Sequence, residues 1–87
     1  MTAGGVCNNE SDVIRTIDEC TKALSELGYN FKKRYWEDSS PNIPSGCSLR
    51  TRNQKLHLND KPGVGRGRKD QIPICKGMQV NYGDSYL

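Results

Sequence analysis

The sequence predicts a small α+β domain in which one N-terminal helix packs on a short antiparallel sheet, with two disulfides stapling the chain. Three observations lead to this class. The chain has 87 residues and is only 33% hydrophobic, so a single core would bury little apolar surface. It carries four cysteines, and small domains with poor cores usually depend on such crosslinks. One apolar stripe at helical period precedes several short segments of strand character.

The helix is predicted over residues 11–27. Asn9 or Ser11 can cap its start, and Gly28 follows the last apolar residue, where a left-handed helix stop is common. Ile14 widens the stripe. The stripe itself recurs every three or four residues: Val13, Ile17, Cys20, Leu24 and Leu27. Cys20 therefore faces the core and needs a partner from another segment.

The rest of the chain predicts short strands and loops. Phe31 and Tyr35 would share one face of the first strand. The hairpin turn, residues 52–54, lacks the glycine that three-residue loops prefer. Pro73 suggests that the last strand lies at an edge. We expect strands at 29–36, 47–51, 55–59 and 72–75, loops at 37–46 and 60–71, a flexible lead at 1–6, one domain at 7–76 and a tail at 77–87.

The cysteines predict two disulfides rather than a metal site. Structural zinc ligands usually occur as close pairs, whereas the gaps here are 13, 27 and 28 residues. Zinc and free thiols remain the alternatives, and no cofactor is expected. Disulfides imply a secreted protein or an oxidising organelle lumen. No apolar run is long enough to span a bilayer.

The stretch "PNIPSGC", residues 41–47, delivers Cys47 along a stiff path. Its prolines hold the backbone extended, and Gly46 permits a sharp bend. Three pairings of four cysteines are possible. We favour Cys20 with Cys47, which clamps the hairpin to the helix, and Cys7 with Cys75, which ties the N-terminal lead to the last strand. Each bridge closes a long loop and could add about 3–4 kcal/mol.

The motifs "C…LG", "PSGC", "KLHLN" and "IPICKG" resemble a small cysteine-rich domain of algal and other protist proteins. The resemblance covers residues 7–76. It implies an extracellular or lumenal module held by disulfides, and it implies no catalytic residues. The chain departs from that pattern at Leu58, where an aromatic residue is common, and in its single final cysteine.

Groups that could carry catalysis are few, so we expect no enzyme. His57 is the only histidine, and alternation with Leu56 and Leu58 predicts an exposed side chain. A hydrolase that uses His57 would need an activated nucleophile, and the sequence shows none committed to it. The adjacent Glu37 and Asp38 are expected in solvent. The run "GVGRGR", residues 63–68, lacks the spacing of a phosphate-binding loop, so its glycines should supply flexibility.

Basic residues form the most informative surface. Residues 1–29 carry two basic and five acidic residues, a net of −3, whereas residues 30–87 carry eleven and five, a net of +6. Arg50, Arg52 and Lys55 surround the hairpin turn. Trp36 and Tyr35 are expected as core or half-buried packing, although an exposed pair would be a contact for a partner. The candidate partner-binding residues are Lys32, Lys33, Arg34, Trp36, Arg50, Arg52, Arg66, Arg68 and Lys69.

These observations predict a non-enzymatic structural or interaction module. It would dock a protein partner with an acidic face through basic loops, for example as a small accessory subunit of a larger assembly. The alternative is a secreted cationic effector or toxin-like binder of membrane surfaces, channels or glycans. The net charge of +3 and the sequence pI near 8.7 argue against nucleic acid as the partner.

Overall fold

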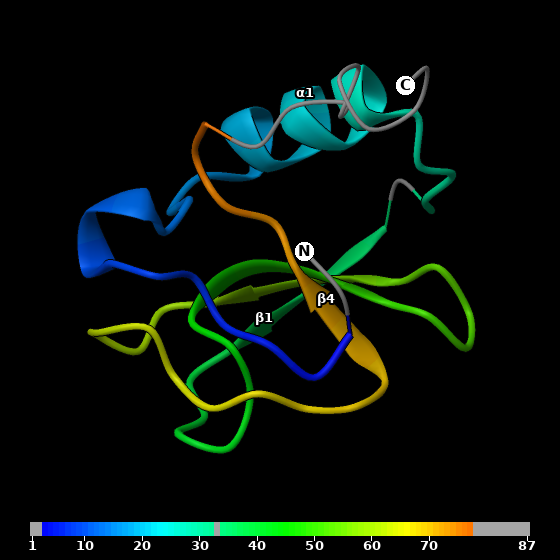
Figure 1. The fold of residues 1–87 in the computed structure, drawn as a ribbon. Coiled ribbons are helices and arrows are strands. Elements are labelled where there is room, and N and C mark those ends of the chain that lie inside the picture. Colours follow the sequence, from blue (N-terminus) through cyan, green and yellow to red (C-terminus); the bar gives the residue numbers. More distant parts are fainter. Residues whose placement is uncertain (1–2, 33, 78–87) are drawn as a thin grey trace, which may run out of the picture.

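The computed structural model describes residues 3–32 and 34–77 and confirms a small α+β domain with one α-helix and a four-stranded sheet. Lys33 and all but the first residue of the predicted tail lie outside the described residues. Figure 1 shows α1 on one side of the sheet, with connecting segments gathered on the other side. The elements are the 3-10 helix Glu10–Asp12, α1 Ile17–Leu27, β1 Tyr35–Asp38, β2 Gly46–Arg50, β3 Leu56–Asn59 and β4 Gln71–Pro73.

Helix α1 is shorter than predicted because the chain before it is extended. The Thr16 hydroxyl caps the helix by accepting a hydrogen bond from the Glu19 N–H, so neither Asn9 nor Ser11 caps it. Val13 instead forms a bridge with Cys75, beside the disulfide that holds that segment. Val13 therefore belongs to the apolar stripe of the sequence, although the chain at this residue is extended and α1 begins only at Ile17. Gly28 ends α1 in the left-handed conformation, as predicted.

The sheet is mixed, with strand order β1-β3-β2-β4, rather than wholly antiparallel as expected. β2 pairs antiparallel with β3 and with β4, whereas β1 pairs parallel with β3. β1 and β2 follow each other in the sequence but are not neighbours in the sheet, because β3 lies between them. The first strand begins only at Tyr35, whereas Tyr29 and Phe31, which were predicted to belong to it, precede the strand and pack against the core.

The predicted β2–β3 hairpin and edge strand are both present. β2 and β3 pair from Gly46 with Asn59 to Leu49 with Leu56. Gln54 adopts a φ of 56°, so a non-glycine residue takes the left-handed position of the turn. β4 lies at the edge of the sheet, which accommodates Pro73 because a proline there need not donate to the ladder.

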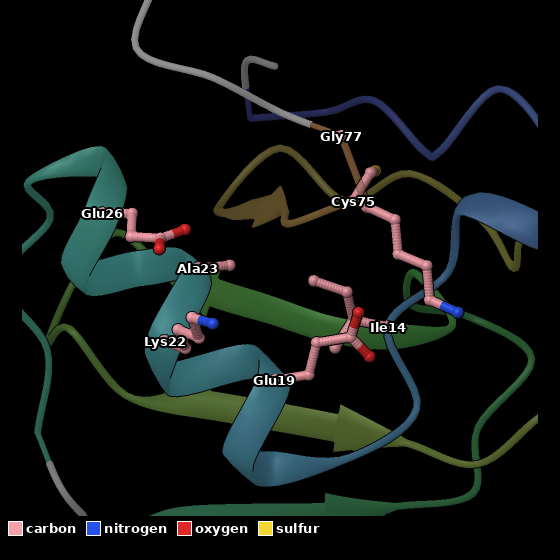
Figure 2. A pocket seen from close by; sticks show the side chains of 8 residues that line it. Ile14, Glu19, Lys22, Ala23, Glu26, Cys75 and Gly77 are labelled. Carbon is pink, nitrogen blue, oxygen red and sulfur yellow. The ribbon is translucent and has the colours of Figure 1, made fainter.

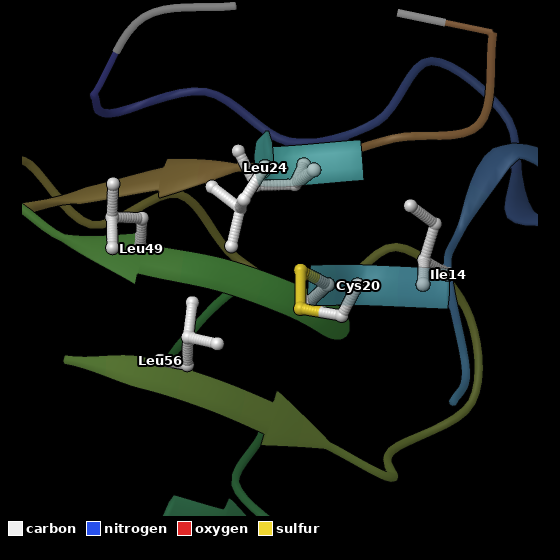
Figure 3. Packing of buried hydrophobic residues seen from close by; sticks show 7 residues of the cluster. Ile14, Cys20, Leu24, Leu49 and Leu56 are labelled. Atoms are coloured by element: carbon white, nitrogen blue, oxygen red, sulfur yellow. A yellow bond between two sulfur atoms is a disulfide. The ribbon is translucent and has the colours of Figure 1, made fainter. Parts of the chain in front are cut away.

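Both favoured disulfides are formed. The Cα atoms of Cys20 and Cys47 are 5.6 Å apart, and those of Cys7 and Cys75 are 5.8 Å apart. Figure 3 shows the Cys20 disulfide between α1 and the sheet, among Ile14, Leu24, Leu49 and Leu56. The second disulfide forms a smaller core with Val13. The two crosslinks are thus part of the two apolar clusters and join the helix, the lead and the sheet.

Gly46 and the glycine-rich connection allow close backbone packing. Gly46 has a φ of +73°, and a Cβ there would lie 2.4 Å from the Ile14 carbonyl oxygen. A Cβ on Gly65 would lie equally close to the Ile43 carbonyl oxygen, and Gly65 forms a bridge with Pro44. The prediction that glycines 63–68 supply flexibility is therefore wrong for Gly65, which lets the loop dock against residues 43–45.

Candidate functional site: a basic–aromatic concavity

Four side chains line a concavity of about 250 Å³ at the N-terminal end of β1: Lys32, Arg34, Trp36 and Lys55. We call it the basic–aromatic concavity. The backbone positions it from two segments. The Lys32 N–H donates to the Gln54 carbonyl at 2.9 Å, which holds the approach to β1 beside the hairpin turn. The parallel pairing of β1 with β3 then places Trp36 opposite His57, next to Lys55.

Trp36 is the one large hydrophobic side chain that is exposed in the described part of the chain, at 51%. The expectation that it packs in or beside the core is wrong, because its neighbour Tyr35 takes the core-facing position of the strand. The Lys55 ammonium lies 4.6 Å from the Trp36 ring centroid, a cation–π contact worth about 0.5–1 kcal/mol at an exposed site. The contact holds a cation and an aromatic ring together at the surface.

The cations of the concavity form no ion pairs within the part of the chain that the structure describes. Within residues 3–32 and 34–77, no carboxylate forms an ion pair with Lys32, Arg34 or Lys55. Their positive charge is therefore available to an anionic group from another molecule. Lys55 is not among the partner-binding residues predicted from the sequence, since its approach to Trp36 depends on the parallel pairing of β1 and β3.

Two other predicted cations, Arg50 and Arg68, share one carboxylate of the same chain. Arg50 and Arg68 both contact Asp70, at 3.3 Å and 2.8 Å. Burial acts to raise the pKa of Asp70, but the charges of Arg68 and Arg50 and the hydrogen bond from Arg50 outweigh it and lower the pKa below its usual value. Arg50 and Arg68 thus serve first to hold the β4 end of the sheet.

The remaining predicted residues stay apart from the concavity. Arg52 is exposed in the hairpin turn, and Arg66 and Lys69 are exposed on the connection between β3 and β4. None of the three lines the concavity. The structure therefore brings together Lys32, Arg34 and Trp36 of the predicted set, and adds Lys55.

His57 is buried, contrary to the expectation of an exposed strand histidine. It lies on the sheet face opposite α1, as alternation predicts, but only 9% of the residue is exposed. Its Nδ1–H donates to the Asp38 carboxylate across 2.6 Å. Asp38 is thus half-buried and bonded, whereas Glu37 is in solvent as expected. The connecting segments on this side of the sheet are the reason, since they remove this face from water.

Ser48 lies directly opposite His57 in the β2–β3 pairing. Asp38, His57 and Ser48 therefore follow one another across the sheet as carboxylate, imidazole and hydroxyl, the arrangement of a hydrolytic triad. The Ser48 hydroxyl and His57 Nε2 are both buried, and neither finds a hydrogen-bond partner in the described part of the chain. A nucleophile needs contact with its base and access for substrate. Ser48 is buried and forms no hydrogen bond with His57 in the described residues, so these three side chains do not support the hydrolase hypothesis.

Two other hollows have linings that include acidic residues. Figure 2 shows Glu19, Lys22 and Glu26 projecting from α1 along a groove that faces Ile14 and Cys75. A hollow of about 390 Å³ at the C-terminal end of β1 is lined mainly by acidic and polar groups: Arg15, Glu37, Asp38, Leu58, Asn59 and Asp60. Among the described residues, no set of three His, Cys, Asp or Glu side chains is placed to hold a metal ion.

Comparison of the chain with protein-family models, curated proteins and solved structures finds no match. The resemblance to algal and protist cysteine-rich domains stays a prediction. No helix in the described residues is long and apolar enough to cross a membrane.

Proposed function

We propose that the protein is a non-enzymatic interaction module that docks an acidic protein partner at the basic–aromatic concavity. The observation that carries the proposal is the exposed Trp36 ring, held under the Lys55 ammonium and flanked by cations that form no ion pair among the described residues. Exposed tryptophan and arginine side chains are the types most often responsible for binding energy at protein interfaces. Unpaired cations around the ring favour a partner with carboxylates.

The two disulfides are consistent with an oxidising compartment. We propose that the protein is secreted or lies in an oxidising organelle lumen. There it would serve as a small accessory subunit of a larger assembly. The predicted resemblance to extracellular protist modules supports the same setting.

A protein partner is favoured over a membrane surface or a glycan because three cations gather around one exposed aromatic ring in a small hollow. Binding to an anionic membrane improves with each lysine or arginine that reaches the surface, so it favours a broad cationic face. Here Arg50 and Arg68 are paired with Asp70, and the groove along α1 mixes acidic and basic groups. One aromatic anchor with a few charges suits a single acidic segment.

Trp36 provides a direct probe, since it is the only tryptophan in the chain. Its fluorescence would be titrated with poly-L-glutamate, and the expected result is saturable binding that weakens with salt. Arg34→Gln and Lys55→Gln should each weaken binding about tenfold or more, the effect of one charge-assisted contact.

Lys22→Gln is the matched control, because Lys22 is an exposed lysine on α1 that lies outside the concavity. It should bind poly-L-glutamate like the wild type. An equal loss in Lys22→Gln would mean that binding follows net charge alone and would contradict the proposal. Tighter binding to phosphatidylserine vesicles than to poly-L-glutamate would favour the membrane alternative instead.

A further inference from the structure

The outer edge of β1 is available for another strand. In the described part of the chain, β1 pairs only with β3 and ends the sheet. The Asp60 N–H donates to the Asp38 carbonyl at 2.9 Å, so the backbone groups of Asp38 face β3. Because backbone groups alternate in direction along a strand, those of Tyr35 and Glu37 face the free edge. Such an unpaired row is a template for strand addition by another chain.

Charge is distributed unevenly along this edge. The N-terminal end of β1 carries the basic–aromatic concavity, whereas the C-terminal end carries the hollow with Glu37, Asp38 and Asp60. Lys32, Arg34 and Trp36 occur at every second residue and line the same hollow. Every second residue is also the spacing at which side chains of an extended segment share one face. A neighbouring extended segment with the same spacing would place one side chain beside each of the three, two of which are cations just before β1.

We propose that the acidic partner binds as an extended strand added to the free edge of β1. Its carboxylates would occupy alternate positions over the basic–aromatic concavity, and its other half, beside the acidic hollow, would carry none. This inference rests on the proposed function and specifies its binding mode. Neighbouring strands hold facing side chains about 4.5–5.5 Å apart, within reach of lysine and arginine. Membranes and polysaccharides lack the row of peptide N–H and C=O groups that the edge requires.

The test uses short peptides that alternate valine and threonine in one half and valine and glutamate in the other. Two sequences are made, with the glutamates in the N-terminal or the C-terminal half, and the tighter binder is kept. Two N-methylated forms of that peptide follow, one with methyl groups on the valine nitrogens and one on the remaining nitrogens. The two forms lose N–H donors on opposite edges and keep the same charge.

Strand addition predicts that one methylated form binds like the parent peptide, while the other binds at least about tenfold more weakly. Hydrogen exchange of the Tyr35 and Glu37 amides should slow when the parent peptide binds. If both forms bind like the parent, or both lose binding, the inference is overturned although the docking of acidic partners still stands. If no glutamate peptide binds at all, the proposed function fails as well.

A pair of protein variants makes the same distinction. Glu37→Pro removes the N–H that faces the free edge, a change tolerated in edge strands. Glu37→Ala removes the same side chain and keeps the N–H. With equal circular dichroism spectra, Glu37→Pro should lose peptide binding and Glu37→Ala should keep it. Equal affinities for the two variants would overturn strand addition.

Discussion

Replacing Asn59 with aspartate should destabilise the protein by disrupting the loop that leads to Cys47. Asn59 lies on β3 and is 1% exposed. Its Nδ2 group donates to the carbonyls of Ser40 at 2.8 Å and Pro44 at 3.0 Å, and its Oδ1 accepts from the Ser40 N–H at 2.9 Å. One side chain thus holds both ends of the segment from Ser40 to Pro44, which leads into Cys47. Aspartate has the same shape but no amide donor.

The expected loss follows from those bonds. A buried group left without its partner costs about 1–3 kcal/mol, and Asn59→Asp leaves two carbonyls without theirs while it adds a buried negative charge beside them. We therefore expect a loss of about 3–5 kcal/mol, out of roughly 4–13 kcal/mol for a domain of this length. A protonated carboxyl can donate one hydrogen bond, so the folded variant favours the protonated form. The loss relative to wild type should then decrease as the pH falls.

Urea denaturation followed by far-ultraviolet circular dichroism, at pH 7 and at acidic pH, measures this loss. Asn42→Asp is the matched control, since Asn42 is exposed in the same loop. The control should lie within about 0.5 kcal/mol of the wild type. If Asn59→Asp were equally mild, or if its loss did not decrease in acid, the role assigned to the Asn59 hydrogen bonds would be wrong.

Three further predictions concern the backbone and the polar pairs. Gly46→Ala should cost about 2–5 kcal/mol in urea denaturation, because its methyl group would overlap the Ile14 carbonyl at a positive φ; a neutral effect would contradict this packing. Asp70→Asn should lower the melting temperature near neutral pH. Since the pKa of Asp70 is lowered on folding, that difference should disappear as the pH falls below about 4, and a constant difference would contradict the ion pairs. Asp38→Ala should cost about 1–3 kcal/mol and remove the downfield His57 Nδ1 proton from the NMR spectrum, and an unchanged signal would contradict the hydrogen bond.

Local features of the sequence predicted much of the fold. The stripe that contains Cys20, the stop at Gly28 and the stiff approach to Cys47 each depend on neighbours in the chain. Together they indicated the helix, the hairpin and the favoured disulfides, all of which the structure contains. The prediction that Val13 is helical was wrong. Its spacing from the other apolar residues fits a helix, but its pairing with Cys75 requires an extended chain.

The candidate site was predictable only in part, because one of its residues depends on a contact between distant segments of the chain. Lys32, Arg34 and Trp36 are close in sequence, so their clustering was visible. Lys55 joins them through the parallel pairing of β1 and β3, which is a long-range contact. Alternation also placed His57 on the correct face of the sheet. Its burial depends on distant segments that cover that face, and the residues next to His57 in the sequence do not indicate where those segments pack.

The most direct test of the account is the free energy of unfolding before and after reduction of the disulfides. The loops span 27 and 68 residues, so chain entropy assigns the two bridges about 3.6 and 4.4 kcal/mol. These losses are comparable to the whole stability expected, so we predict that the reduced protein is largely unfolded at 25 °C. A reduced protein with four reactive thiols and the same urea midpoint as the oxidised form would contradict it.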